Sequence, residues 1–158
     1  MMDQHEKFMQ MAIDIATEGM NNNIGGPFGC VIVKNGEVVG KGCNSVASTN
    51  DPTAHAEVVA IRDACRHLNT FQLDGCFVYT TCEPCPMCLG AIYWARPAKV
   101  YYGCTRQDAA AFQFDDDFIY KEIDLPFNDR TIPLYQCNRK EAFKIFKNWK
   151  EKEGKIQY

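Results

Sequence analysis

The sequence lacks any long apolar run, since the most continuous one, from Cys88 to Ala95, ends at Arg96 after eight residues. A helix that crosses a membrane needs about 20 consecutive apolar residues, so we expect no membrane partner. The first residues, from Met1 to Lys7, also lack the apolar core of a secretion signal. These two absences predict a cytoplasmic protein.

An excess of positive charge is absent too, because the formal net charge is −3 and the sequence pI is about 5.6. Proteins that track a phosphate backbone usually carry a basic surface. The one lysine-rich stretch lies near the C-terminus, where its lysines alternate with Glu141, Glu151 and Glu153. We therefore do not expect a nucleic-acid partner.

Internal repeats, low-complexity segments and domain linkers are also missing from the sequence. At 158 residues, with 46% hydrophobic and 23% charged residues, the chain has an ordinary globular composition. We predict one domain that spans residues 1–158. The periodicity of its segments favours a layered α/β fold with a mixed sheet.

Local patterns predict most of the helices and strands. The pair Asn35-Gly36 is a strong signal for a tight hairpin between two strands. Helices are expected over Asp3–Asn21, Ala54–Leu68, Pro86–Ala95 and Arg139–Lys152, with a shorter one over Asp108–Phe114. Strands are expected over Phe28–Val33, Val38–Asn44, Cys76–Thr80, Lys99–Gly103 and, as a fifth, Leu134–Cys137.

Cysteine, by contrast, is abundant, and its nine copies form an odd number. An odd count without a secretion signal favours metal ligands and buried thiols over a disulfide framework. Cys85 and Cys88 lie three positions apart at the predicted start of a helix. They are the best candidates for metal ligands.

His55 and Glu57 lie at another predicted helix start, upstream of this cysteine pair. One imidazole and two thiolates are ligands that tetrahedral zinc accepts, and three ligands leave one position for a water molecule. Zinc makes such a water a nucleophile near neutral pH, and Glu57 is the proton carrier that it needs. His-x-Glu followed by Pro-Cys-x-x-Cys is a known signature of zinc-dependent nucleobase deaminases.

Other interpretations of the cysteine pair remain open at this point. Cys85 and Cys88 alone are compatible with a redox-active pair, or with a structural zinc site in a non-enzymatic module that binds a partner. A structural site needs a fourth ligand, for which Cys82 is the near candidate. Because Cys82 would have to bend back from a strand end, we predict that it is a buried thiol.

The chain resembles the cytidine deaminase superfamily and, more narrowly, the bacterial guanine deaminases. The resemblance runs over almost the whole chain. It rests on the stretches Gly25–Gly29, Asn50–Glu57, Cys82–Pro97, Phe114–Asp116 and Phe118–Ile123. Transfer-RNA adenosine deaminases and cytosine deaminases share the zinc motif, so those activities remain the alternatives. The acidic loop and the C-terminal tyrosine favour guanine.

The resemblance implies a three-layer fold with a five-stranded mixed sheet between helices. It implies one Zn²⁺ per subunit on His55, Cys85 and Cys88, with Glu57 as the proton shuttle. The reaction expected from it is the hydrolytic deamination of guanine to xanthine and ammonia.

The same resemblance assigns further residues to the purine site. Asp116 would read the guanine edge and assist catalysis, with Asp115 as the alternative because this chain has three aspartates where two are expected. The other substrate contacts that it implies are Asn44, Phe28, Ala56, Trp94 and Tyr158. Relatives exchange their C-terminal segment, here about residues 138–158, so we expect a homodimer in which Tyr158 closes the partner's pocket.

Overall fold

The computed structural model describes residues 3–114 and 116–158. The chain divides into two compact units, of which the first ends at Asp117 and the second comprises Phe118–Tyr158. The predicted metal ligands all belong to the first unit.

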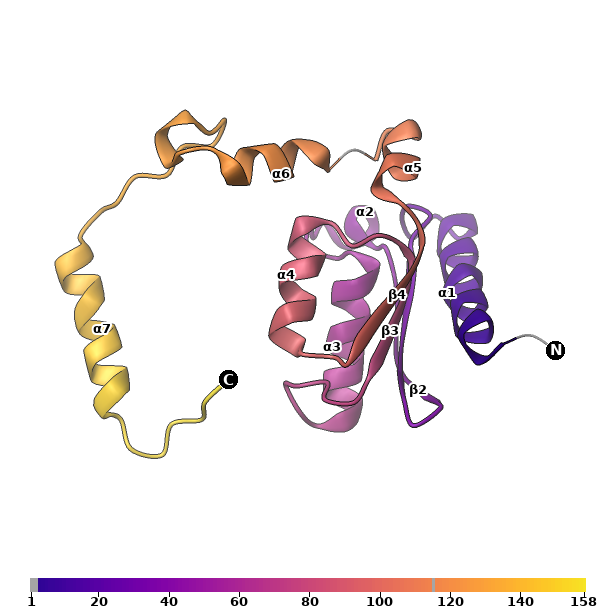
Figure 1. Ribbon diagram of the computed structural model, residues 1–158, viewed down its shortest axis with the longest axis horizontal. Coiled ribbons are helices and arrows are strands. Elements are labelled where there is room, and N and C mark those ends of the chain that lie inside the picture. Colours follow the sequence, from indigo (N-terminus) through magenta and orange to yellow (C-terminus); the bar gives the residue numbers. More distant parts are fainter. Residues whose placement is uncertain (1–2, 115) are drawn as a thin grey trace. The chain divides into compact units, whose positions relative to one another are not determined.

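The first unit is an α/β structure, and its elements follow the predicted order (Figure 1). Its strands are β1 (Gly29–Lys34), β2 (Glu37–Cys43), β3 (Phe77–Cys82) and β4 (Lys99–Cys104). Its helices are α1 (Gln4–Asn21), α2 (Val46–Thr49), α3 (Ala56–Leu68), α4 (Pro86–Ala95) and α5 (Arg106–Ala111).

The strands form one mixed sheet in the order β2-β1-β3-β4. β1 pairs with β2 and with β3 in antiparallel fashion, whereas β3 and β4 are parallel. Asn35 and Gly36 both have positive φ angles, of 51° and 82°, as a type I′ hairpin between β1 and β2 requires. The predicted hairpin is therefore confirmed, and so is the parallel pair joined through α4.

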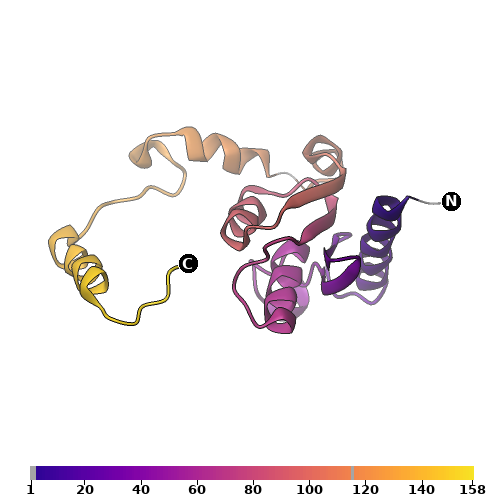
Figure 2. The same ribbon diagram turned by 60° about the horizontal axis from the view of Figure 1, so that its bottom comes forward.

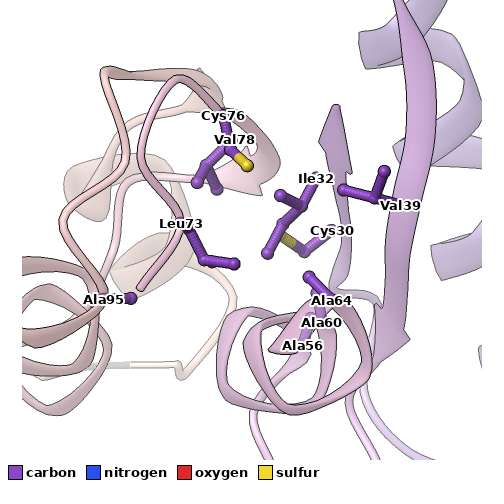
Figure 3. Close-up of a cluster of buried hydrophobic side chains, with 10 residues drawn as sticks. All are labelled: Cys30, Ile32, Val39, Ala56, Ala60, Ala64, Leu73, Cys76, Val78 and Ala95. Carbon is purple, nitrogen blue, oxygen red and sulfur yellow. The ribbon is translucent and has the colours of Figure 1, made fainter. Parts of the chain in front are cut away.

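Helices cover the sheet on both sides, as two views of the first unit show (Figures 1 and 2). On one face, Phe8 and Ala12 of α1 pack with Val31, Val33 and Tyr79. On the other face, side chains of the sheet pack with side chains of α3, of α4 and of the loops between the elements (Figure 3), and this cluster is Cys30, Ile32, Val39, Ala56, Ala60, Ala64, Leu73, Cys76, Val78 and Ala95. Alternate residues of each strand supply the two cores, which makes the fold a three-layer α/β structure.

Small residues let α3 lie unusually close to β2. A Cβ atom added at Gly42 would lie 2.3 Å from the carbonyl oxygen of Ala56, and one at Gly40 would lie 2.6 Å from that of Ala60. No side chain fits at such distances, so glycine at these positions permits the backbone contact. The contact fixes the start of α3, where His55 and Glu57 lie, against the sheet.

The second unit contains α6 (Asp117–Asp124, which begins at the last residue of the first unit), a 3₁₀ turn (Phe127–Asp129) and α7 (Arg139–Glu151). None of residues 118–158 is buried. Apolar side chains at least 39% exposed are Phe118, Ile123, Leu125, Phe127, Ile132, Leu134, Tyr135, Phe143, Ile145, Phe146, Trp149, Ile156 and Tyr158.

The prediction of a fifth strand is wrong for the described residues, where the sheet has four strands and Leu134–Cys137 forms none. This segment alternates like a strand, but no described strand of its own unit is available to pair with it, and a lone strand leaves its backbone groups without a ladder. Sequence analysis also missed α2 and α6. Within the described ranges, no helix combines the length and the apolar character needed to cross a membrane.

Candidate active site

Three donor side chains meet at one point of the first unit. Among the described residues, His55, Cys85 and Cys88 form the cluster that could hold a metal ion, and their ligand atoms all lie within 4.8 Å of one another. His55 Nδ1 lies 3.6 Å from Cys85 Sγ and 3.5 Å from Cys88 Sγ. A tetrahedral zinc ion with ordinary Zn–N and Zn–S bonds places nitrogen about 3.6 Å from each sulfur. The cluster therefore fits zinc.

Two helix starts bring these donors together. His55 is the N-cap residue of α3, and Cys85 is the N-cap residue of α4, with Pro86 in the first turn. Cys85 Sγ accepts a hydrogen bond of 3.5 Å from the backbone N–H of Cys88. Because both helix N-termini carry a partial positive charge, they favour thiolate ligands and a bound hydroxide at this point.

The cluster stabilises one negative charge on its sulfur atoms. Hydrogen bonds from Cys88 and then from His55 lower the pKa of Cys85 to about 4. Cys88 and His55 each form a hydrogen bond with Cys85, and these two bonds raise the pKa of Cys88 and the pKa of His55. A metal ion that binds here therefore meets one thiolate already formed and displaces the proton of the other thiol.

Cys82 is not among the donors of the cluster, as predicted. It is buried, and its S–H group points to the carbonyl oxygen of Thr105 at 3.7 Å. Burial raises the pKa of Cys82 to about 11, so this thiol stays protonated. Within the described part of the chain the site has three donors, which is typical of catalytic zinc.

Glu57 lies one half-turn from His55 and is 6% exposed. Thr80, which is 1% exposed, donates a hydrogen bond of 3.0 Å from Oγ1 to Glu57 Oε1. Burial raises the pKa of Glu57, whereas its hydrogen bonds, including those with Cys88 and Thr80, lower it. A carboxylate held beside the cluster with a raised pKa suits a group that takes and returns protons.

The loop before α3 is held by its own hydrogen bonds. Asp51 Oδ1 accepts bonds of 2.8 Å and 2.7 Å from the backbone N–H and the hydroxyl of Thr53. The backbone N–H of Ala54 donates to the carbonyl oxygen of Asp51 at 3.0 Å. These bonds fix the turn that leads into His55.

Asn44 follows β2 and lies beside the same loop. Its neighbour Ser45 donates a backbone hydrogen bond of 2.9 Å to Ala54, the residue before His55. Asn44 Oδ1 accepts a bond of 3.2 Å from the backbone N–H of Gly26. Asn44 thus lies one residue from a backbone contact with the loop that leads into His55.

Two aromatic rings and one carboxylate border this region. Phe28 and Phe114 pack edge to face, with ring centroids 4.9 Å apart. Phe114 lies two residues before Asp116, and the charge of Asp116 contributes to the raised pKa of His55. Asp116 is therefore near enough to the cluster to act on it electrostatically. Asp115, the alternative carboxylate, lies outside the described residues.

The other predicted substrate residues lie in different settings. Ala56 is fully buried under β2, next to Glu57. Trp94 is 65% exposed and lies on another face of α4 than the buried Cys88. Tyr158 is 72% exposed and belongs to the second unit.

Sequence analysis missed Thr80 and Gly26 as contributors to the site. Thr80 looked like one more residue of an alternating strand, because its contact with Glu57 spans 23 positions. Gly26 looked like a breaker between helix and strand. The stretch Gly25–Gly29 was a signal for the fold, but nothing in it named Asn44 as the partner.

Comparisons with known proteins agree with this geometry. The family model described as the cytidine and deoxycytidylate deaminase zinc-binding region matches residues 2–104. Guanine deaminase of Bacillus subtilis (strain 168) is 56% identical over 154 residues, which cover 98% of this chain and 99% of that protein. An X-ray structure of guanine deaminase from Bacillus subtilis has a TM-score of 0.95 at 56% identity, over 98% of each chain.

A more distant relative covers less of the chain. A tRNA-specific adenosine deaminase of Buchnera aphidicola (subsp. Schizaphis graminum) is 40% identical over 123 residues, which cover 78% of this chain and 79% of that protein. The similarity to guanine deaminase thus extends well beyond residue 104, where the family model ends. That additional part contains Asp116.

Proposed function

This chain belongs to the cytidine and deoxycytidylate deaminase family, and we propose that it is a guanine deaminase, a zinc aminohydrolase that converts guanine and water to xanthine and ammonia. The observation that carries this proposal is the 56% identity to a guanine deaminase over 98% of the chain. The transfer-RNA relative matches a smaller part at lower identity. Guanine is therefore favoured over adenosine in transfer RNA.

His55, Cys85 and Cys88 hold the zinc ion, because their donor atoms have the spacing that a tetrahedral ion needs. Zinc bound there lowers the pKa of a water molecule in its open position and so supplies the nucleophile. Two thiolates offset much of the charge of the ion, which makes this water less acidic than at an all-histidine site. A neighbouring base is correspondingly more important.

Glu57 is that base in our proposal. Its carboxylate takes the proton of the attacking water and passes it to the ring nitrogen next to the carbon that bears the exocyclic amine. Glu57 then takes the second proton, from the hydroxyl group now bonded to that carbon, and gives it to the amine. The carbon–nitrogen bond breaks, the amine leaves as ammonia, and the hydroxyl becomes the carbonyl of xanthine. Thr80 holds one carboxylate oxygen and so orients the carboxylate for these transfers. We assign Asp116 to assist protonation of the leaving amine, since its charge reaches His55.

The remaining residues form the purine pocket in our proposal. Asn44 binds the polar edge of the base, and Phe28 supplies an apolar wall that Phe114 supports. Ala56 contributes backbone at the start of α3. Trp94 and the partner subunit's Tyr158 close the pocket.

We also propose that residues 1–158 act as one deaminase domain within a homodimer, with the C-terminal segment of about residues 138–158 exchanged between subunits. The second unit supports this, because it has no buried residue and exposes many large apolar side chains. Phe146 of α7 is 69% exposed. Such apolar surface normally lies in an interface.

Sedimentation equilibrium of the full chain tests the homodimer. We expect a dimer at micromolar concentration, and we expect Phe146→Glu to dissociate it. Asn148→Glu adds the same charge about 200° further around α7, so it is the matched control and should leave the dimer intact. A wild-type monomer would contradict the proposal.

A cytoplasmic location is supported by the cysteines. All nine are free in the structure, and Cys85 and Cys88 must be reduced to bind zinc. A reducing compartment keeps them so.

Ammonia release from a panel of bases tests the function. The purified zinc enzyme should act on guanine and much more weakly, or not at all, on guanosine, adenine, cytosine and a transfer-RNA anticodon stem. Preferred release from the anticodon stem would establish the transfer-RNA alternative. Stoichiometric zinc without any ammonia release would indicate a non-enzymatic zinc module, and a cysteine pair without zinc would indicate a redox site.

A further inference from the structure

Asn44 is fixed by hydrogen bonds on both sides of its α-carbon. Its own backbone N–H donates to the carbonyl oxygen of Phe28 at 3.0 Å, and the next N–H, of Ser45, donates to Ala54 at 2.9 Å. Phe28 borders β1, and Ala54 precedes His55. The backbone of Asn44 therefore connects the edge of the sheet to the loop that carries the zinc ligand, and its side chain has little freedom to move.

The side-chain amide of Asn44 is also oriented. Its Oδ1 atom accepts the backbone N–H of Gly26 at 3.2 Å. The carboxamide is planar, and its oxygen and its NH₂ group lie on opposite sides of Cγ. Once the oxygen faces Gly26, the NH₂ group faces away from it. A carboxamide turned by 180° would place its NH₂ group against the N–H of Gly26, and the hydrogen bond from Gly26 would be lost.

Gly25 makes this arrangement possible because it has no side chain. A Cβ atom at Gly25 would lie 2.2 Å from the backbone oxygen of Asn44 and 2.5 Å from its Oδ1. The φ angle of Gly25 is not in the left-handed region, so space and not backbone conformation requires glycine here. At Gly26 an added Cβ would make only ordinary contacts with Phe28 and Phe114.

We propose that the Gly25-Gly26 turn fixes the orientation of the Asn44 carboxamide, so that Asn44 meets the purine only as a hydrogen-bond donor. Gly25 and Gly26 are then positioning residues, and Asn44 is the group that binds. This inference rests on the proposed function, because it takes guanine as the ligand. A fixed donor selects a base that presents an acceptor and disfavours one that presents an amine at the same place.

The donor role is tested by comparing Asn44→Asp with Asn44→Ala. Aspartate keeps an oxygen for the Gly26 N–H but has no NH₂ group. We expect both variants to raise the KM for guanine about 10-fold or more, as for the loss of one buried hydrogen bond, while zinc content stays at one per subunit. A wild-type KM in Asn44→Asp would overturn the proposal, because an acceptor alone would then suffice.

Analogues of guanine identify the acceptor that Asn44 binds. In 3-deazaguanine and 7-deazaguanine a ring nitrogen becomes C–H, and 2-aminopurine lacks the carbonyl oxygen. Measured as competitive ligands, one of the three should bind the wild-type enzyme about 10-fold more weakly than guanine, and Asn44→Ala should remove that difference. An equal loss of affinity for guanine and all three analogues in Asn44→Ala would contradict donor readout.

A double-mutant cycle tests the positioning role of Gly25. We expect Gly25→Ala to raise the KM for guanine about as much as Asn44→Ala does, and to add little when Asn44 is already alanine. Gly75→Asn is the control, because Gly75 has a positive φ that asparagine tolerates and open space around its Cβ position. If Gly25→Ala raises the KM by the same factor in the wild type and in Asn44→Ala, the substitution acts through the fold and not through Asn44. The proposal would then fail.

Failure of this inference is distinguishable from failure of the proposed function. If the wild-type enzyme releases no ammonia from guanine, the function itself is wrong. If it does, and the Asn44 variants keep the wild-type KM, only the donor role is wrong. Should Gly25→Ala not fold, the Asn44 variants and the analogues still test the orientation directly.

Discussion

Thr80 Oγ1 lies 3.0 Å from Glu57 Oε1, and both side chains are buried beside the zinc ligands. The hydroxyl comes from the middle of the sheet and the carboxylate from the first turn of α3. A buried carboxylate oxygen that lost this donor would have no solvent to replace it. Thr80 therefore both satisfies Glu57 and fixes the direction of its second oxygen.

Replacing Thr80 tests this relationship. Thr80→Val keeps the shape of the side chain and removes the donor, so we expect kcat to fall about 10-fold while zinc content is unchanged. Thr80→Ser restores the hydroxyl and should recover most of the rate. Steady-state kinetics with zinc analysis measures both, and a Thr80→Val enzyme as fast as Thr80→Ser would remove this role.

Glu57→Gln tests the proton carrier with almost no change in volume. Glutamine cannot take a proton from water, so we expect kcat to fall by roughly 10²- to 10⁴-fold. The zinc ligands are untouched, and the protein should still contain one zinc per subunit. Turnover near the wild-type rate would exclude Glu57 from the mechanism.

Cys85→Ser tests the metal centre. A serine hydroxyl is a much poorer zinc ligand than a thiolate, so we expect loss of zinc and of activity together. Cys104→Ser is the control, because Cys104 is exposed at the end of β4 and is not part of the cluster. Zinc measured by elemental analysis should be lost in the first variant and retained in the second.

Gly42→Ala tests the close approach of α3 to β2. The added Cβ would meet the carbonyl oxygen of Ala56 at 2.3 Å and the backbone nitrogen of Ala60 at 2.6 Å. Moving the helix away should lower the free energy of unfolding by about 1–3 kcal/mol. Gly90→Ala, whose Cβ meets nothing within 4 Å, lies within α4 and should be at least as stable as the wild type in thermal unfolding, because alanine favours a helix over glycine.

The stability supplied by Asp51 should depend on pH. The hydrogen bond from the side chain of Thr53, and then that from its backbone, lower the pKa of Asp51 below its ordinary value. Its contribution is therefore fully present above the unfolded pKa of about 3.9 and is lost as the pH falls through the lower folded value. The difference in Tm between wild type and Asp51→Ala should be largest near neutral pH and shrink below pH 4. A difference that grows with acidity would contradict this sign.

The sequence by itself determined the chemistry of the site. His55, Glu57, Cys85 and Cys88 were readable because each pair lies within one helix start, where spacing along the chain is also spacing in space. The hairpin at Asn35-Gly36 was readable for the same reason, since positive φ angles are a local property of those residues. Local rules apply wherever the interacting groups are close in sequence.

Only the tertiary structure decided which distant groups serve that chemistry. The contact of Thr80 with Glu57 spans 23 positions, and that of Gly26 with Asn44 spans 18. Such pairs depend on strand register and helix packing. A shift of one residue in strand pairing would turn each side chain of the strand to the opposite face of the sheet. The segment Leu134–Cys137 has the alternating pattern of a strand but forms none in the structure. Such a segment becomes a strand only when a neighbouring strand offers its backbone hydrogen bonds.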